Sequence, residues 1–244
     1  MFPRIDIFGL NVNSSYFFWG VGIIVAQIYY QFFGKKYGYR WYQSLLFGFL
    51  FLVFEIIGAK ILYTIENFNY ILENGMSFGG FSFFGVMFSI PLFVWILSKC
   101  AKVSYGKLID FASVGILFEL AFYRVGCTCA GCCRGLPFIF GMTYPDGVTL
   151  FPVQPIEAVL DFVLAVVLIV LFLNKKLHNG EQYMLYMSGY GAIRFVLEFT
   201  RERNNLIGVF SLSHIWAALA LVVGIIVFYR LRGINKCEIE NLIQ

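Results

Sequence analysis

Long apolar segments alternate with short polar connections along nearly the whole chain. A helix needs about 20 mostly apolar residues to cross the hydrocarbon core of a bilayer. Seven segments meet this requirement: Tyr16–Phe33, Ser44–Thr64, Phe78–Leu97, Leu108–Val125, Val153–Leu173, Tyr183–Phe199 and Val209–Tyr229. No long repeat and no linker rich in Pro and Ser divides them. The pattern therefore predicts an all-α, polytopic membrane protein with seven transmembrane helices, built as a single integral membrane domain over residues 1–244.

The composition agrees with this prediction. Hydrophobic residues make up 60% of the chain and charged residues only 13%, whereas a soluble domain is about 25% charged. The same numbers exclude a disordered chain. The first residues, "MFPRIDIFGLNVNSS", lack the basic region and short apolar core of a signal peptide, so we expect the first span to be retained. No basic stripe interleaved with aromatic residues is present, and we expect no nucleic-acid partner.

Lysine and arginine mark the orientation, because they are enriched in cytoplasmic connections. On alternate connections and in the tail lie Lys35, Lys36, Arg40, Lys99, Lys102, Lys107, Lys175, Lys176, Arg230, Arg232 and Lys236. This predicts an N-terminus outside and a C-terminus in the cytoplasm. Arg124, Arg134, Arg201 and Arg203 lie on the opposite side. They are candidates for function, although contact with lipid phosphates is the plainer interpretation.

Charged residues within spans usually face a cavity or a partner, since they cost several kcal/mol in lipid. In "YGAIRFVLEFTRER", Arg194 and Glu198 are four residues apart and share one helix face. They form either a self-satisfied ion pair or an arginine aimed at an anion, because the planar guanidinium binds two phosphate oxygens at once. Gln154 and Glu157 open the fifth span, where capping of the helix N-terminus is the plainer interpretation for Glu157.

Four of the six cysteines fall within "YRVGCTCAGCCRG". The C-x-C-x-x-C-C spacing lacks the separate second pair that is usual for zinc, and no histidine is near, so we expect no metal site. A thiol–disulfide oxidoreductase would need a second cysteine pair in another outer connection, and the sequence has none there. A local disulfide, joining Cys127 to Cys132 or Cys129 to Cys133, and close packing of small residues both remain open. Cys127 could also act as a nucleophile, three residues after Arg124.

Several segments together carry a resemblance. "GGFSFFG", "GKLIDFASVG", "FYRVGCTCAGCCRGLPFIFGMTYPDGVTLFPVQPIEAVLDF", "YGAIRFVLEFTRERNN" and "FSLSHIWAAL", in this order, resemble the prolipoprotein diacylglyceryl transferase family. The resemblance implies a multi-pass enzyme of the bacterial cytoplasmic (inner) membrane that uses no cofactor. It implies transfer of the diacylglyceryl group of phosphatidylglycerol to a cysteine thiol of a lipobox-containing prolipoprotein, at the outer face, with glycerol phosphate leaving.

The resemblance also implies roles for individual residues. The implied catalytic residues are Arg124, Arg194, Glu198 and Tyr16. The implied substrate-binding residues are Gly135, Gln154, Glu157 and Cys127, and Arg201 joins them as an arginine on the outer side. The arginines would stabilise the departing phosphate, Glu198 would hold Arg194, and Tyr16 would donate a hydrogen bond to the phosphate or to a glycerol oxygen.

The sequence departs from the family pattern in the groups that handle protons. Phe84 and Phe151 stand where the family has histidines, Cys127 replaces an asparagine, and Cys132 replaces an acidic residue. No obvious base remains, although Glu157, an outer carboxylate or the arginines could promote formation of the acceptor thiolate. Three alternatives stay open: a related transferase with another acceptor, such as a glycan or small thiol; a membrane thiol–disulfide exchange protein; and a lipid-binding subunit without activity. His214 is interpreted as a polar partner at a helix start.

Overall fold

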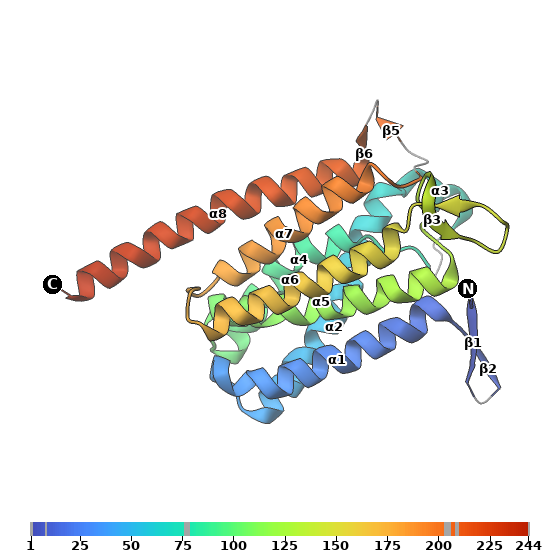
Figure 1. Cartoon of the computed structure of the whole chain (residues 1–244). Coiled ribbons are helices and arrows are strands. Elements are labelled where there is room, and N and C mark those ends of the chain that lie inside the picture. The colour runs from blue at the N-terminus through green and yellow to red at the C-terminus, as the bar shows by residue number, and fades with distance from the viewer. Residues whose placement is uncertain (1, 8, 76–78, 203–205, 208–209, 244) are drawn as a thin grey trace. The chain divides into compact units, whose positions relative to one another are not determined.

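A computed structural model describes residues 2–7, 9–75, 79–202, 206–207 and 210–243. Within these ranges the chain forms eight helices (Figure 1): α1 (Ser14–Tyr37), α2 (Trp41–Glu66), α3 (Phe68–Asn74), α4 (Phe83–Ala101), α5 (Tyr105–Ala130), α6 (Val153–Leu173), α7 (Glu181–Glu198) and α8 (Leu212–Ile243). Seven of them overlap the seven predicted spans, of which only Val153–Leu173 has the predicted ends, and the short α3 was not predicted. The predicted boundary residues Phe78 and Val209, like Arg203, lie outside the described residues.

Five of the described helices, α1, α2, α4, α6 and α8, are long and apolar enough to cross a membrane. The other two predicted spans, α5 and α7, carry ionisable residues within the helix, including Arg124 and Arg194. The structure therefore supports an all-α, polytopic membrane protein.

Helix α6 has the burial pattern of a helix with one side facing lipid. Its polar residues Gln154, Glu157 and Asp161 are buried, whereas the apolar Phe162 and Val163 are exposed. This is the reverse of a helix on the surface of a soluble protein. Because lipid tails are as apolar as these side chains, the pattern directs the polar residues of α6 into the protein.

The chain forms two compact units, Met1–Ile28 with Ser113–Gln244, and Tyr29–Ala112. In the second of these, α2 and α4 pack through glycine. A Cβ atom placed on Gly85 would lie 2.3 Å from the carbonyl oxygen of Gly58. The ring of Phe111 packs against Tyr30 and Tyr37 at centroid distances of 4.9 and 5.0 Å. Phe84 is buried in this unit.

The other unit contains α6, α7, α8 and the C-terminal part of α5. Helices α7 and α8 lie side by side (Figure 1) and approach closely, since a Cβ atom on Gly191 would lie 2.7 Å from the backbone nitrogen of Leu221. Small residues at helix contacts allow such approach in membrane proteins. Gly126 likewise allows α5 and the start of α1 to approach closely, because an added Cβ atom would lie 2.7 Å from the Cα atom of Ser15.

Three antiparallel two-stranded hairpins, which the apolar pattern did not predict, connect or precede helices. They are β1 (Arg4–Ile7) with β2 (Leu10–Asn13), β3 (Pro137–Thr143) with β4 (Thr149–Leu150), and β5 (Leu206–Ile207) with β6 (Phe210–Ser211). In the first hairpin Arg4 is opposite Asn13. The last helix is longer than the predicted span, because α8 continues past Tyr229 to Ile243.

Candidate active site

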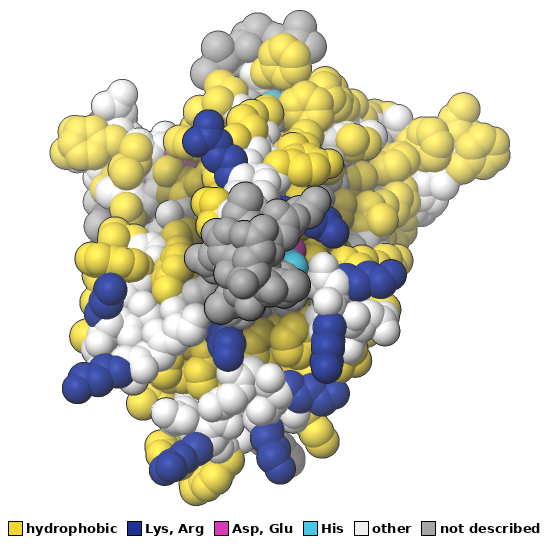
Figure 2. All heavy atoms as spheres, turned by 90° about the vertical axis from the view of Figure 1, so that its left-hand side faces the viewer, with side chains coloured by type: hydrophobic (Ala, Val, Ile, Leu, Met, Phe, Trp, Pro, Cys, Tyr) yellow, Lys and Arg dark blue, Asp and Glu magenta, His cyan; other side chains and the backbone are white. Residues whose placement is uncertain are grey.

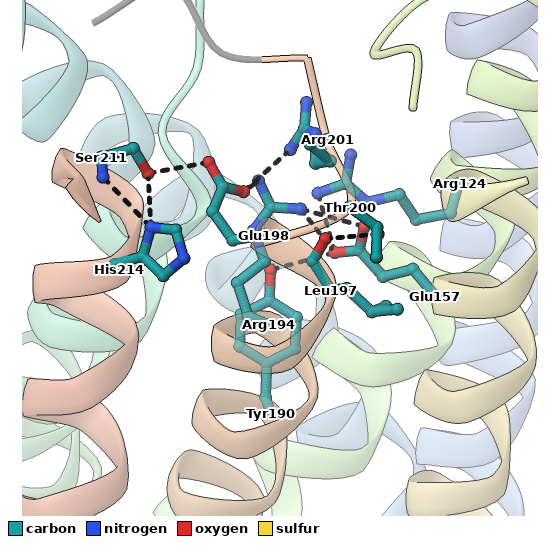
Figure 3. Close-up of polar contacts among 10 residues, drawn as sticks. All are labelled: Arg124, Glu157, Tyr190, Arg194, Leu197, Glu198, Thr200, Arg201, Ser211 and His214. Atoms are coloured by element: carbon teal, nitrogen blue, oxygen red, sulfur yellow. Dashed lines mark hydrogen bonds and ion pairs between the residues drawn. The ribbon is translucent and has the colours of Figure 1, made fainter. Parts of the chain in front are cut away.

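The carboxylate of Glu157 lies at the centre of a buried polar cluster (Figure 3). Its Oε1 atom lies 3.0 Å from Nη2 of Arg124, and its Oε2 atom lies 3.1 Å from Nη1 of Arg194. Tyr190 donates a hydrogen bond to Oε1 over 3.4 Å. These contacts join α5, α6 and α7. Glu157 therefore binds two arginines from neighbouring helices, which the capping interpretation did not predict.

Arg194 extends the cluster along α7. Its Nη2 atom lies 2.8 Å from Oε2 of Glu198, which confirms the pair predicted from the four-residue spacing. Nη1 of Arg201 lies 3.7 Å from the same oxygen. Three arginines and two glutamates thus meet in one network, with one net positive charge. Such a network suits a ligand with a single negative charge, such as a phosphodiester.

Two of the arginines keep donor atoms for a further acceptor. Among the described residues, the buried Nε atoms of Arg124 and Arg201 have no hydrogen-bond partner. Buried donors are rarely left without an acceptor in native proteins. Oxygens of a phosphate could accept these hydrogen bonds, and charge-assisted bonds of this kind are among the strongest in proteins.

His214 is held at the start of α8. The backbone N–H of Ser211 donates to its Nδ1 over 3.1 Å, and the Ser211 hydroxyl lies 3.0 Å from Nδ1 and donates to Oε1 of Glu198 over 2.9 Å. A side chain three residues into a helix that accepts the N–H at its start is a capping interaction. This geometry favours the interpretation of His214 as a polar partner at a helix start.

Asp161 belongs to the cluster's surroundings and was not singled out from the sequence. It lies one helical turn after Glu157, is fully buried, and neither of its carboxyl oxygens has a hydrogen-bond partner among the described residues. The signal was present, because Gln154, Glu157 and Asp161 occur at i, i+3 and i+7 and therefore share one face of a helix.

The cysteine segment folds back on itself at the end of α5. The Sγ atoms of Cys127, Cys132 and Cys133 all lie within 4.8 Å of one another. Gly131 and Cys133 have φ angles of 71° and 57°, so the backbone turns sharply here. The left-handed region is uncommon for a residue with a side chain, and it directs the chain back toward Cys127.

These three residues form the thiol trio, with Cys127 buried and Cys132 exposed. The cysteines described by the structure, Cys100, Cys127, Cys129, Cys132 and Cys133, are free thiols, so neither predicted disulfide is formed here. Hydrogen bonds from the Cys127 and Cys132 thiols, and then the positive charges of Arg124 and Arg194, lower the pKa of the Cys133 thiol. Burial opposes this shift.

Gln154 and Gly135 hold the cysteine segment in place. The Gln154 amide donates to the carbonyl oxygen of Cys132 and, over 3.0 Å, to the hydroxyl of Tyr144. A Cβ atom on Gly135 would lie 2.3 Å from the carbonyl oxygen of Phe151, and Gly135 also forms an isolated bridge with Arg201. Both residues therefore position backbone in this structure, and their role in binding substrate stays a prediction.

Tyr16 lies near the start of α1 with 47% of its surface exposed. Tyr16 takes part in none of the ion pairs that join the described residues of the cluster. The structure thus brings together Arg124, Glu157, Arg194, Glu198 and Arg201, and leaves Tyr16 outside this network.

The fold and the site define a polytopic membrane protein in which α5, α6 and α7 supply a buried, arginine-rich site suited to an anionic ligand. The model of the prolipoprotein diacylglyceryl transferase family matches residues 5–230. The chain belongs to this family, which confirms the resemblance seen in the sequence.

Known relatives carry the corresponding name. The chain is 30% identical to phosphatidylglycerol–prolipoprotein diacylglyceryl transferase 2 of Clostridium perfringens over 249 aligned residues, with 96% of this chain and 94% of the relative covered. It is 27% identical to the enzyme of that name from Clostridium tetani, with 91% and 94% covered. For the enzyme from Dehalococcoides mccartyi strain BAV1 the identity is 32%, with 72% and 73% covered.

Proposed function

We propose that this chain transfers the diacylglyceryl group of phosphatidylglycerol to the cysteine thiol of a lipobox-containing prolipoprotein. One structural observation carries the proposal. Arg124, Arg194 and Arg201 converge on two glutamates in a buried site, where Glu157 and Glu198 fix the guanidinium groups. Membership of the family supplies the class of reaction.

The reaction is a displacement at carbon. The acceptor thiolate forms a C–S bond to the glycerol carbon that carries the phosphate, and the C–O bond to the phosphate breaks. A phosphodiester with one negative charge becomes a phosphate monoester with two, so negative charge develops on the leaving group. Arg124 and Arg194 stabilise this charge in a site with little water, where electrostatic interactions are strong. Glu157 and Glu198 hold these arginines in place before the reaction, which avoids the cost of ordering them during it.

We also propose how the chain crosses the membrane. Helices α1, α2 and α4 to α8 would be the seven transmembrane helices of a single domain in the bacterial cytoplasmic membrane, with the N-terminus outside and the C-terminus in the cytoplasm. The positions of the basic residues support this orientation. Lys35 and Lys36 lie in the last turn of α1, Lys99 lies in the last turn of α4, and Lys175 follows α6. In the view of Figure 2, lysine and arginine side chains are visible and acidic side chains are few.

The test uses the full chain in phosphatidylglycerol liposomes with a lipobox peptide that carries one cysteine. Peptide mass and released glycerol phosphate are followed for wild type, Arg194→Gln and Arg230→Gln. Arg230 is an exposed arginine in the C-terminal half of α8 and serves as the matched control. We expect a diacylglyceryl mass gain in wild type and Arg230→Gln, and a loss of about 100-fold or more in Arg194→Gln.

Other results would select the alternatives. Glycerol phosphate released without modification of the peptide would indicate a different acceptor, such as a glycan or small thiol. Thiol–disulfide exchange that survives Arg194→Gln would replace the transferase proposal. Lipid that binds without any turnover, beside an active relative, would leave a lipid-binding subunit.

A further inference from the structure

The thiol trio has the composition and spacing of a metal site with an open position. In a tetrahedral zinc site with Zn–S bonds of about 2.3 Å, the sulfur atoms are about 3.8 Å apart. The Sγ atoms of Cys127, Cys132 and Cys133 lie within 4.8 Å of one another, so small side-chain rotations would complete this geometry. Structural zinc sites have four protein ligands, whereas catalytic sites have three and leave the fourth position for water or substrate. Thiolates select soft ions such as Zn²⁺ and Cu⁺.

Zinc ligands usually come as two separated pairs, and this segment lacks the second pair. The fold instead supplies one ligand from the last turn of α5 and two from the turn that follows, which bends back because Gly131 and Cys133 have positive φ angles. Gln154 fixes this turn through the carbonyl oxygen of Cys132. Sequence spacing alone could not show that three sulfur atoms meet.

The charges around the trio suit a metal–thiolate complex. Zn²⁺ with three thiolates carries one net negative charge, and a fourth thiolate makes it two. The positive charges of Arg124 and Arg194 act on Cys133, so they would stabilise such an anionic complex. The same two arginines line the site assigned above to the phosphate. A thiol bound at the trio would therefore lie beside the group that leaves.

We infer that Cys127, Cys132 and Cys133 hold a Zn²⁺ ion whose fourth position binds the acceptor cysteine as a thiolate. This inference rests on the proposed function and supplies the activation of the acceptor that the chain otherwise lacks. A metal ion deprotonates a coordinating thiol outright, and the thiolate is the nucleophile. The acceptor loses its proton to water on binding. Its sulfur lone pair then forms the C–S bond, and the electron pair of the C–O bond leaves with glycerol phosphate, so no oxidant or reductant is required.

The exposure of Cys132 gives an incoming thiol access to the trio, while the buried Cys127 anchors it in α5. Cys129 lies in the same segment but outside the trio. The chain thus offers a matched control, because Cys129→Ser changes a neighbouring thiol without removing a ligand. Cys132→Ser removes a ligand at an exposed position, where a serine is tolerated by the fold.

The binding experiment uses the full chain, reduced and free of metal, with Co²⁺ as the spectroscopic probe. We expect one Co²⁺ per chain with a sulfur-to-cobalt charge-transfer band, which Cys132→Ser weakens by about a third because one of three thiolates is lost. Cys129→Ser should match wild type. Adding a lipobox peptide with cysteine should raise the band by about a third, as a fourth thiolate binds, and a peptide with serine should leave it unchanged. Equal bands in Cys132→Ser and Cys129→Ser would overturn the inference. So would a disulfide between two members of the trio in protein taken directly from the membrane.

The transfer assay separates this inference from the proposed function. A free thiol with a pKa of about 8.5 is about 3% thiolate at pH 7, so removal of the metal should lower the transfer rate about 30-fold. Restored zinc should recover it. Undiminished transfer by chelator-treated enzyme would overturn the zinc site and leave the transferase intact. A cobalt band that responds to the cysteine peptide, without any transfer, would support the site as a thiol-binding metal centre and remove the proposed function.

Discussion

Replacing Glu157 with glutamine tests whether the arginine cluster is held by this one carboxylate. The variant keeps the size of the side chain and removes its charge, which leaves Arg124 and Arg194 facing each other in a site where both are at most 7% exposed. At the observed distances of 3.0 and 3.1 Å, each ion pair contributes about 5 kcal/mol at an effective dielectric constant of about 20. Desolvation offsets much of this, and removal of one partner of a buried pair typically costs about 3–5 kcal/mol.

The assay is thermal unfolding of the full chain in phosphatidylglycerol-containing micelles. A chain of this size loses about 2–4 °C of Tm per kcal/mol, so Glu157→Gln should lower Tm by about 6–20 °C. Glu73→Gln, an exposed glutamate in α3, is the matched control and should shift Tm by less than about 2 °C. Equal shifts in the two variants would refute the reasoning.

A double variant measures the coupling energy between Arg124 and Glu157. Arg124→Gln in addition to Glu157→Gln removes both members of one pair, while Arg194 keeps Glu198 as its partner. The double variant should be more stable than the sum of the two single effects by about 0.5–3 kcal/mol. Strict additivity would show that the 3.0 Å contact between Arg124 and Glu157 contributes no coupling.

Four further outcomes are expected. Arg194→Lys keeps the charge but loses the planar fork that contacts Glu157 and Glu198 together, so transfer in liposomes should fall about 100-fold. Gly135→Ala should destabilise the protein by about 1–3 kcal/mol in thermal unfolding, because its Cβ atom would meet backbone, whereas Gly20→Ala, with open space around it, should not. His214→Gln can still accept the Ser211 N–H and should keep transfer within about twofold; a loss near 100-fold would instead make His214 a catalytic base. The pKa of the Cys133 thiol is lowered by hydrogen bonds from Cys127 and Cys132, so its thiolate persists as pH falls. In metal-free enzyme, alkylation at pH 6, followed by peptide mass spectrometry, should therefore be faster at Cys133 than at a free cysteine peptide.

The positions of the helices were predictable because one physical requirement dominates them. A bilayer offers no hydrogen bonds to the backbone, so each apolar segment of sufficient length must form a helix. The seven predicted segments accordingly overlap seven of the described helices, five of which are long and apolar enough to cross a membrane, while the short α3 and the hairpins were not predicted. Hairpins such as β3–β4 lack a comparable signal, since two-stranded pairs this short have no sustained alternation of polar and apolar residues.

The sequence by itself also determined the partners within one helix. Arg194 and Glu198 pair because residues four apart must lie on one face, whatever surrounds the helix. Sequence order likewise identified the family, since its motifs are recognised without coordinates.

Only the tertiary structure decided which helices share a ligand. The 32 residues between Arg124 and Glu157 impose no distance between them, and the contact exists because α5 and α6 pack with both polar faces inward. Tertiary structure also decided that the three sulfur atoms of the thiol trio meet. Its spacing gave no metal motif, and only the sharp turn after α5 brings three sulfur atoms within 4.8 Å. Local periodicity determines which residues share one face of a helix. Packing between helices determines which faces meet, and the site is formed where these faces meet.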